Sequence, residues 1–187
     1  MCGDSLMAEQ LSFQIKDGGS IPTSPLQFDI KEIGVKTACE LNSRWHSRLP
    51  LIDWSNVVRN RYYVCYGALF EQSWYAIAIW SSPVNQNFNL AETLELRRMA
   101  INENAPKNTA SRMIRVMIQL IRKRYPLIAK LISYQDTEVH SGTIYRASGW
   151  RGASRTKYQA WDKSRNRTES QSKADKIRWE YQLRKNG

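Results

Sequence analysis

The sequence predicts a single α/β domain in which helices flank a mixed β-sheet. A length of 187 residues with 42% hydrophobic content is enough for one full core. Strand-like and helix-like segments alternate along the chain, which is typical of a sheet covered by helices. The longest helix-like segment joins two strand-like segments, so those two strands are expected to pair in parallel. We expect a flexible arm at residues 1–25, the domain at residues 26–161 and a basic extension at residues 162–187.

The first half of the domain is expected to contain a strand, a helix and a hairpin. Residues 26–33 alternate apolar and polar side chains, the pattern of a half-buried strand that ends before a glycine. A helix over residues 35–45 is expected to follow. Residues 61–70 and 73–80 are rich in aromatic and β-branched side chains and are separated by two polar residues. This pair of segments indicates a β-hairpin.

The second half is dominated by one long helix. Residues 93–101 are interpreted as a third strand of the same sheet. Residues 107–125 form the clearest helical pattern, because their apolar positions recur at helical spacing. A buried strand at residues 131–134, a short helix at 143–147 and an extended segment from 150 to 161 complete the expected order. The apolar positions of the long helix are Ala110, Met113, Ile114, Met117, Leu120 and Ile121.

The chain is strongly basic. It has 28 Lys and Arg against 17 Asp and Glu, a formal net charge of +11. Residues 151–187 carry eleven Lys and Arg and four Asp and Glu, so +7 of this charge is concentrated in that stretch. Such a charge predicts attraction to a polyanion such as nucleic acid. No apolar run approaches the ~20 residues that span a bilayer, and no signal-peptide pattern opens the sequence, so a cytoplasmic location without membrane contact is expected.

The cysteine and histidine content limits the chemistry. Cys2, Cys39 and Cys65 are odd in number and widely spaced, so they are interpreted as reduced thiols rather than a disulfide framework or zinc knuckle. Only His46 and His140 are present, which excludes a metal site made of three histidines.

The loop that precedes the long helix is a candidate phosphate site. A helix start exposes unpaired backbone N–H groups and a partial positive charge, and Lys107 adds a full charge there. Asn108, Thr109 and Ser111 can donate to phosphate oxygens or cap the helix, so a merely capped helix start is the alternative. The sequence has no Walker-type lysine loop and no dinucleotide glycine fingerprint.

A second feature is the segment Gly142–Trp150, in which Tyr145 precedes a glycine by four residues and an aromatic residue by five. Together with the element order over residues 26–161, it resembles the GNAT superfamily of acyl-CoA-dependent N-acyltransferases. The resemblance implies a GNAT-like, largely antiparallel sheet, a loop before the long helix that grips the CoA pyrophosphate, and a tyrosine facing the CoA sulfur. The usual Arg/Gln-x-x-Gly-x-Gly/Ala loop is replaced here by Ala-Pro-Lys-Asn-Thr-Ala-Ser at residues 105–111.

A narrower resemblance is to the Mom family of bacteriophage adenine-modification proteins, a divergent GNAT branch. It implies that acetyl-CoA or another acyl-CoA binds, that the adenine amine of phage DNA is modified by carbamoylmethylation to block restriction enzymes, and that an iron ion takes part. The segments that carry it are Leu94–Met99, Ala105–Ser111, Ile132–Asp136 and His140–Tyr145, with a partial match at His46–Pro50.

Two residues are the candidates for catalysis. Tyr145 has a phenol with a pKa near ~10, which can give a proton to a departing thiolate; packing on the sheet is the alternative role. Asp136 follows a short apolar strand, where open α/β sheets gather their ligands. It is suited to act as a base, a metal ligand or a reader of the base pair, and equally to cap the following turn.

The candidate cofactor residues come from the resemblance and from the helix start. They are Arg98, Lys107, Asn108, Thr109, Ala110 and Ser111. Glu95 and Arg98 are expected on opposite faces of their strand, because strand side chains alternate, and the resemblance favours Arg98 for the site. His46 is the candidate metal ligand, since a neutral imidazole suits iron.

The aromatic and basic residues allow two interpretations each. An extruded adenine could stack on aromatic side chains, although strands also favour aromatics in their core. The basic residues after the short helix could follow DNA phosphates or form a solvated tail. Two other functions therefore stay open: an N-acyltransferase for a protein or small-molecule amine, and a non-catalytic basic DNA-binding module. The aromatic set is Trp45, Trp54, Tyr62, Tyr63, Trp74 and Trp80, and the basic set is Arg151, Arg155, Lys157, Lys163, Arg165 and Arg167.

Overall fold

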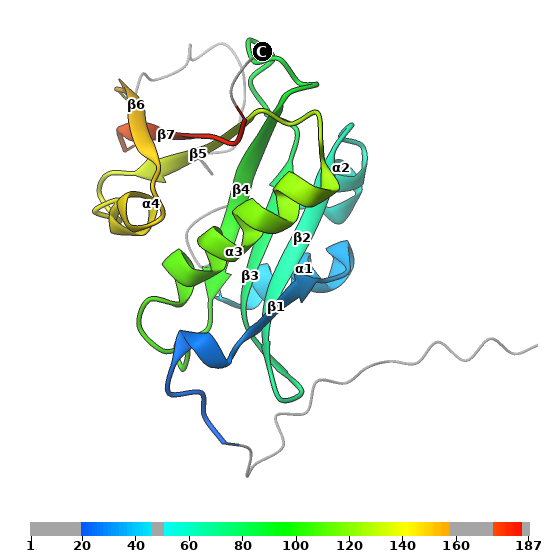
Figure 1. Ribbon diagram of the computed structural model, residues 1–187, viewed down its shortest axis with the longest axis vertical. Coiled ribbons are helices and arrows are strands. Elements are labelled where there is room, and N and C mark those ends of the chain that lie inside the picture. The colour runs from blue at the N-terminus through cyan, green and yellow to red at the C-terminus, as the bar shows by residue number, and fades with distance from the viewer. Residues whose placement is uncertain (1–19, 46–50, 158–173, 185–187) are drawn as a thin grey trace, which may run out of the picture.

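The computed structural model describes residues 20–45, 51–157 and 174–184. These residues form a seven-stranded sheet with helices on both faces (Figure 1). None of their helices is long and apolar enough to span a bilayer. The elements are a 3-10 turn at Pro25–Gln27, β1 at Asp29–Glu32, α1 at Val35–Trp45, α2 at Trp54–Val58, β2 at Tyr63–Phe70, β3 at Ser73–Ser81, β4 at Thr93–Ile101, α3 at Thr109–Arg124, β5 at Lys130–Asp136, α4 at Thr143–Ala147, β6 at Arg151–Thr156 and β7 at Lys176–Gln182.

The strand order is β1-β2-β3-β4-β5-β7-β6. Every neighbouring pair is antiparallel except β4 and β5, which are parallel. The parallel pair is the one joined by α3, because a crossover helix carries the chain back to the starting end of the sheet. The expected mixed, largely antiparallel α/β sheet is confirmed.

The core on one face of the sheet lies under α3. Met113, Met117 and Ile121 recur at helical spacing and are fully buried against the strands. Trp80 of β3 is buried in the same cluster and donates its indole N–H to the sulfur of Met117 at 3.2 Å. This layer fixes α3 on the sheet, so the position of the helix start is set by the packing behind it.

The opposite face carries α1 and α2. Ala38 and Leu41 of α1 and Val57 of α2 bury Ile77 and Ile79 of β3. Helix α1 packs on β2, β3 and β4, so the core on this face covers only that part of the sheet (Figure 1). The α3 face is therefore the broader core, and α4 extends it over β5 and β7.

Two short elements in the first half differ from the sequence prediction. The strand expected at residues 26–33 is only four residues long, because Ser24 opens a 3-10 turn as a capping box with Gln27. Helix α2 was not predicted. Asp53 caps it by accepting from the backbone N–H of Ser55 at 3.0 Å, and its five residues are too few to show a helical period.

The stretch after residue 161 contains a strand that the sequence reading missed. β7 lies between β5 and β6 and pairs with both. Trp179 is buried in the α3-side core, and the backbone N–H of Leu183 donates to the carbonyl of Ala129 at 2.8 Å. The basic composition of this stretch therefore does not prevent it from supplying an interior strand, since its charged residues alternate with apolar ones.

A β-bulge in β4 overturns the expectation for Glu95 and Arg98. Arg98 pairs with Ile79 of β3, and Leu96 pairs with Trp80, so Arg97 is the extra residue. A bulge shifts the alternation by one position. Glu95 and Arg98 consequently point to the same face, the one covered by α1, and not to opposite faces.

Candidate functional site

The pairing between β4 and β5 ends in the middle of both strands. Their pairing covers only four positions and ends with Leu96 opposite Ser133. Beyond that point β4 continues to Ile101 and β5 to Asp136 without pairing to each other. The separation begins next to the bulge at Arg97, and it leaves the carboxyl ends of two parallel strands side by side, where open sheets bind ligands.

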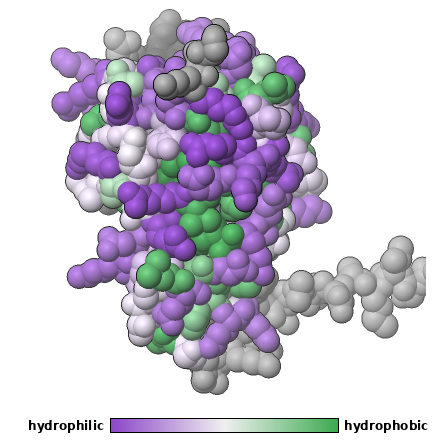
Figure 2. Space-filling model, viewed as in Figure 1, coloured by the Kyte–Doolittle hydropathy of each residue, from purple (hydrophilic) through white to green (hydrophobic). Residues whose placement is uncertain are grey.

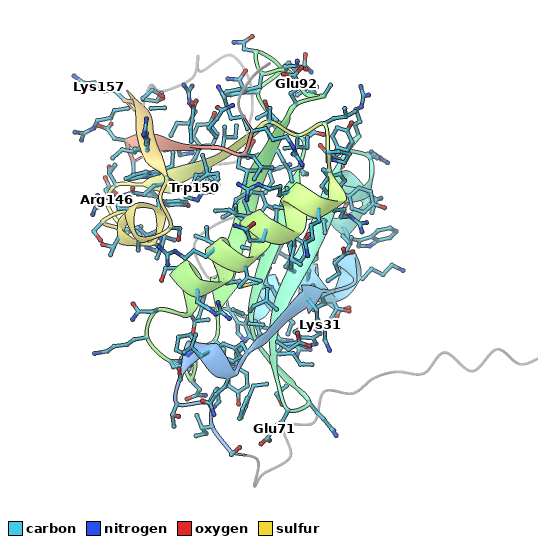
Figure 3. All side chains as sticks on the ribbon, in the orientation of Figure 1. Lys31, Glu71, Glu92, Arg146, Trp150 and Lys157 are labelled. Carbon is cyan, nitrogen blue, oxygen red and sulfur yellow. The ribbon has the colours of Figure 1, made fainter. Side chains whose placement is uncertain are left out.

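Tyr145 of α4 lies at the point where the two strands separate. Its hydroxyl is 2.9 Å from the hydroxyl of Ser133, which itself donates to the carbonyl of Leu96 at 3.2 Å. The Tyr145 ring stacks on Trp179 with ring centres 5.3 Å apart and makes an edge-type contact with Trp150. Trp150 lies between α4 and β6 (Figure 3). Burial raises the pKa of Tyr145, and the hydrogen bond with Ser133 opposes part of that rise. The phenol is therefore protonated at neutral pH and is suited to give a proton.

The loop before α4 is built around a glycine in a left-handed conformation. Gly142 has φ +74°, and a Cβ there would lie 2.5 Å from both Gln135 Oε1 and Trp179 Cζ2. Trp179 Nε1 donates to Gln135 Oε1 at 2.7 Å, and Gln135 Nε2 donates to the His140 carbonyl. Only glycine fits this crowded turn. It holds α4 so that Tyr145 faces Ser133.

The start of α3 is not capped by a side chain. Asn108, the N-cap residue, has φ +69°, and its side chain makes no capping hydrogen bond. The Thr109 hydroxyl donates to the Pro106 carbonyl at 2.7 Å, and the Ser111 hydroxyl donates to the Asn108 carbonyl at 3.1 Å. The alternative of a side-chain-capped helix start does not hold. The left-handed Asn108 supplies the backbone shape for which a glycine is the usual residue.

A cavity of about 180 Å³ opens at this helix start. It lies between the end of β4, the first turn of α3 and α4, and Lys107 is exposed next to its lining. The predicted residues from Asn108 to Ser111 are thus brought together around one cavity. Tyr145 is not part of its lining, although the neighbouring Ile144 is. The lining residues are Ile101, Pro106, Asn108, Thr109, Ala110, Ser111, Thr143, Ile144 and Ala147.

Arg98 and Asp136 lie on the sheet face opposite α3. Arg98 donates from Nη1 to the carbonyl of Arg97 at 2.8 Å and so supports the bulge. Asp136 accepts from the backbone N–H of Glu138 at 3.0 Å, the turn-capping role considered above. Alternation along β5 points Asp136 away from the face of Ser133 and Gln135. The structure therefore does not bring Arg98 to the α3 start, nor Asp136 to the face of Tyr145.

Polar residues inside the strands were missed as parts of the site. Ser133 and Gln135 are buried in β5 and orient Tyr145 and α4 respectively. Glu95, set aside above in favour of Arg98, is 7% exposed and accepts from the Val84 N–H at 3.1 Å. Burial raises the pKa of Glu95, which the Val84 hydrogen bond and the nearby arginines partly oppose. The sequence does contain a signal for Glu95 and Ser133, since each is a polar side chain between apolar neighbours in a strand.

The described residues contain no group of three or more His, Cys, Asp or Glu that could hold a metal ion. His140 is exposed, and His46 lies outside the described residues. The iron implied by the resemblance has no ligand set in this part of the chain.

The aromatic candidates divide between core and surface. Trp80 is fully buried, and Trp74 and Trp45 pack against the α1-side core. Trp54 is 43% exposed, with the Lys36 ammonium 4.6 Å from its ring centre, and Tyr63 is also exposed. Tyr62 packs at the edge of the α3-side core.

The α3 face also carries a larger, shallower cavity of about 680 Å³ between α3, the end of α4 and β7. Val116, Ile118 and Leu120 contribute its apolar lining, and Arg112 and Arg115 its charge. Figure 2 shows this face as hydrophilic around a central hydrophobic strip. Of the predicted basic set, Arg155 pairs with Asp175 at 3.2 Å, whereas Lys163, Arg165 and Arg167 lie outside the described residues.

The fold of the described residues is GNAT-like. The solved ribosomal-protein-S18-alanine N-acetyltransferase of Escherichia coli matches with a TM-score of 0.60 and 14% identity, over 86% of this chain and 96% of that chain. The yncA protein of Salmonella typhimurium, solved with its cofactor acetyl-CoA, matches with a TM-score of 0.61 and 10% identity, over 86% and 96%. These likenesses show the fold.

The sequence itself identifies the family. The model of the Mom protein family matches residues 27–186. The chain belongs to the Mom protein family, and the match includes β7. No curated protein matches the sequence.

Proposed function

We propose that this protein uses an acyl-CoA to modify the amine of adenine in DNA. The observation that carries the proposal is the uncapped start of α3, open to a cavity, in a chain of the Mom family. The acetyl-CoA named for one structural neighbour supports an acyl-CoA as the cofactor. Transfer of the acyl carbon to the amine would break one N–H bond and the thioester bond, and it would give an N-acyladenine and the free CoA thiol. This modification, made in the host cytoplasm, would protect phage DNA from restriction, as the carbamoylmethyl adenine implied by the Mom resemblance would.

The residues at the α3 start would hold the cofactor. The Thr109 N–H donates to the Pro106 carbonyl, so the N–H groups that follow it in the first helical turn, together with the left-handed Asn108, would form the cradle for a diphosphate, and Lys107 would add positive charge. An acyl-CoA supplies an activated acyl carbon and a thiol leaving group. Lys107, Asn108, Thr109, Ala110 and Ser111 are the residues proposed for this role; Arg98, on the other face, would act at the acceptor side instead.

Tyr145 and Asp136 would act from the two faces of the sheet. The Tyr145 hydroxyl, held by Ser133, would give the proton that the leaving thiolate needs. Asp136 lies at the carboxyl end of β5 on the other face, where it would orient the acceptor amine. The donor and the acceptor would meet where the pairing of β4 and β5 ends.

A nucleoside analysis tests this proposal. DNA from cells that express the protein is digested and its nucleosides are weighed by mass spectrometry. We expect an adenosine species with added mass that is absent from cells carrying an empty vector. Unmodified adenosine, together with transfer to a peptide or small amine, would instead support the second candidate, an N-acyltransferase like the Escherichia coli neighbour. DNA binding without binding of acetyl-CoA would favour a non-catalytic module.

Two substitutions of Asn108 test the cofactor cradle. Asn108→Gly is expected to preserve acetyl-CoA binding, because glycine adopts a positive φ without strain. Asn108→Val is expected to weaken it about tenfold or more, because a β-branched residue resists that conformation and the first-turn N–H groups move. Titration calorimetry with acetyl-CoA measures both, and a melting curve shows whether Asn108→Val stays folded. Equal affinities for the two variants would contradict the cradle.

A further inference from the structure

Half of the sheet face opposite α3 is free of helices in the described part of the chain. α1 packs on β2, β3 and β4, and no described helix makes more than marginal contact with β5, β7 or β6 from that side. Because Ser133, Gln135 and Trp179 point to α4, the alternate residues of β5 and β7 point to this free half. Those residues are Lys130, Ile132, Tyr134 and Asp136 of β5 and Lys176, Arg178, Glu180 and Gln182 of β7, and of these Ile132 is fully buried.

Arg178 is the centre of this surface. Its guanidinium lies 5.2 Å from the ring centre of Phe88, and its Nε is 2.9 Å from Glu180 Oε1. Tyr134 is its cross-strand partner and forms a hydrogen bond with it. Phe88 and Tyr134 are both half-buried. The arginine is thus held against two aromatic side chains; we call Phe88, Tyr134 and Arg178 the arginine–aromatic cluster.

The loop that contains Phe88 is held by hydrogen bonds and is rich in Asn and Gln residues. Asn85 accepts from the backbone N–H of Asn87, and Asn89 accepts from that of Ala91, both at 3.0 Å. Glu95 ties the base of the loop to β4 through the Val84 N–H. Gln86 is exposed within the first of these turns. The loop therefore presents amide side chains next to the cluster.

These groups have the chemistry that recognises unpaired nucleotides. Bases that have left a duplex stack on aromatic rings and on arginine guanidinium groups, and arginine also neutralises phosphate. Asn and Gln side chains can pair with the edge of adenine. A base must leave the duplex before its amine can be reached.

We propose that the arginine–aromatic cluster is the docking surface for an unpaired stretch of the target DNA. The inference rests on the proposed function, in which DNA is the acceptor. The surface lies on the face opposite the α3 start and Tyr145, so an acceptor bound there and a donor bound at α3 would meet where β4 and β5 part.

Binding of a short fluorescent oligo-dA strand, measured by anisotropy without acyl-CoA, tests the surface. Phe88→Leu keeps an apolar side chain but removes the ring, and we expect about tenfold weaker binding. Arg178→Gln is expected to weaken binding by a similar factor and to reduce its salt dependence. Arg115→Gln is the matched control: it removes an exposed cation from α3, on the other face, and should change binding by less than about twofold.

A second variant, Gln86→Glu, tests the same surface in case Phe88→Leu or Arg178→Gln fails to fold. The side chain is exposed, so the protein should fold, and the new carboxylate should weaken oligo-dA binding by repelling phosphate. The surface is overturned if Phe88→Leu and Gln86→Glu bind like the parent, or if Arg115→Gln loses as much as Arg178→Gln. When the parent protein still binds and modifies DNA in that case, only the surface is wrong. A parent that neither binds nor modifies DNA overturns the proposed function and the surface together.

Discussion

Replacing Tyr145 with phenylalanine is expected to lower the rate of transfer by about 10²- to 10⁴-fold, the usual worth of a positioned proton donor. The change removes only the hydroxyl that meets Ser133 and keeps the ring on Trp179. The melting temperature and acetyl-CoA affinity should therefore stay near those of the parent. The rate of formation of modified adenosine is the measurement.

Ser133→Ala is the control for this variant. It removes the partner of the Tyr145 hydroxyl but leaves the phenol in place, so a smaller loss of rate is expected. Burial keeps the pKa of Tyr145 above its ordinary value of ~10. The rate of transfer should therefore show no change near neutral pH that comes from ionisation of Tyr145. A Tyr145→Phe enzyme with the parent rate would show that the phenol only packs.

Replacing Trp179 with alanine is expected to destabilise the protein by about 3–5 kcal/mol, the usual cost of removing a large aromatic side chain from a core. Trp179 stacks on Tyr145 and donates to Gln135, so its loss leaves a cavity and an unpaired amide oxygen. For a domain of this size the melting temperature should fall by roughly 10 °C or more. Thermal unfolding followed by circular dichroism measures the shift.

Trp54→Ala is the matched control. The same residue type is replaced, but Trp54 is 43% exposed, so the expected loss of stability is below about 1 kcal/mol. Similar melting temperatures for the Trp179 and Trp54 variants would show that β7 is not an integral strand of the sheet.

Elements with a clear period were predictable from the sequence. The helix at residues 35–45, the strand at 93–101 and the short helix at 143–147 have the expected bounds. The parallel pairing across α3 also follows from element order alone. β7 was missed although Ile177, Trp179 and Tyr181 alternate with charged residues, because the excess of positive charge was given more weight than that alternation.

The site was less predictable than the fold, because it depends on backbone irregularities. The bulge at Arg97 has no local sequence signal, yet it decides the face of Arg98 and the place where β4 leaves β5. Asn108 adopts a left-handed conformation that is more usual for glycine, so a glycine pattern could not find it. Tyr145 was found through a spacing pattern, whereas its partner Ser133 depends on a tertiary contact.

The late position of β7 along the chain has a consequence for synthesis on the ribosome. Of the described strands, β6 pairs with β7 alone, so β6 has no sheet to join until residues 176–182 have been made. Until then the outer edge of β5 is a bare row of amide and carbonyl groups, the kind of edge that invites pairing with another nascent copy. Premature termination before β7 should therefore give aggregates rather than a smaller folded protein.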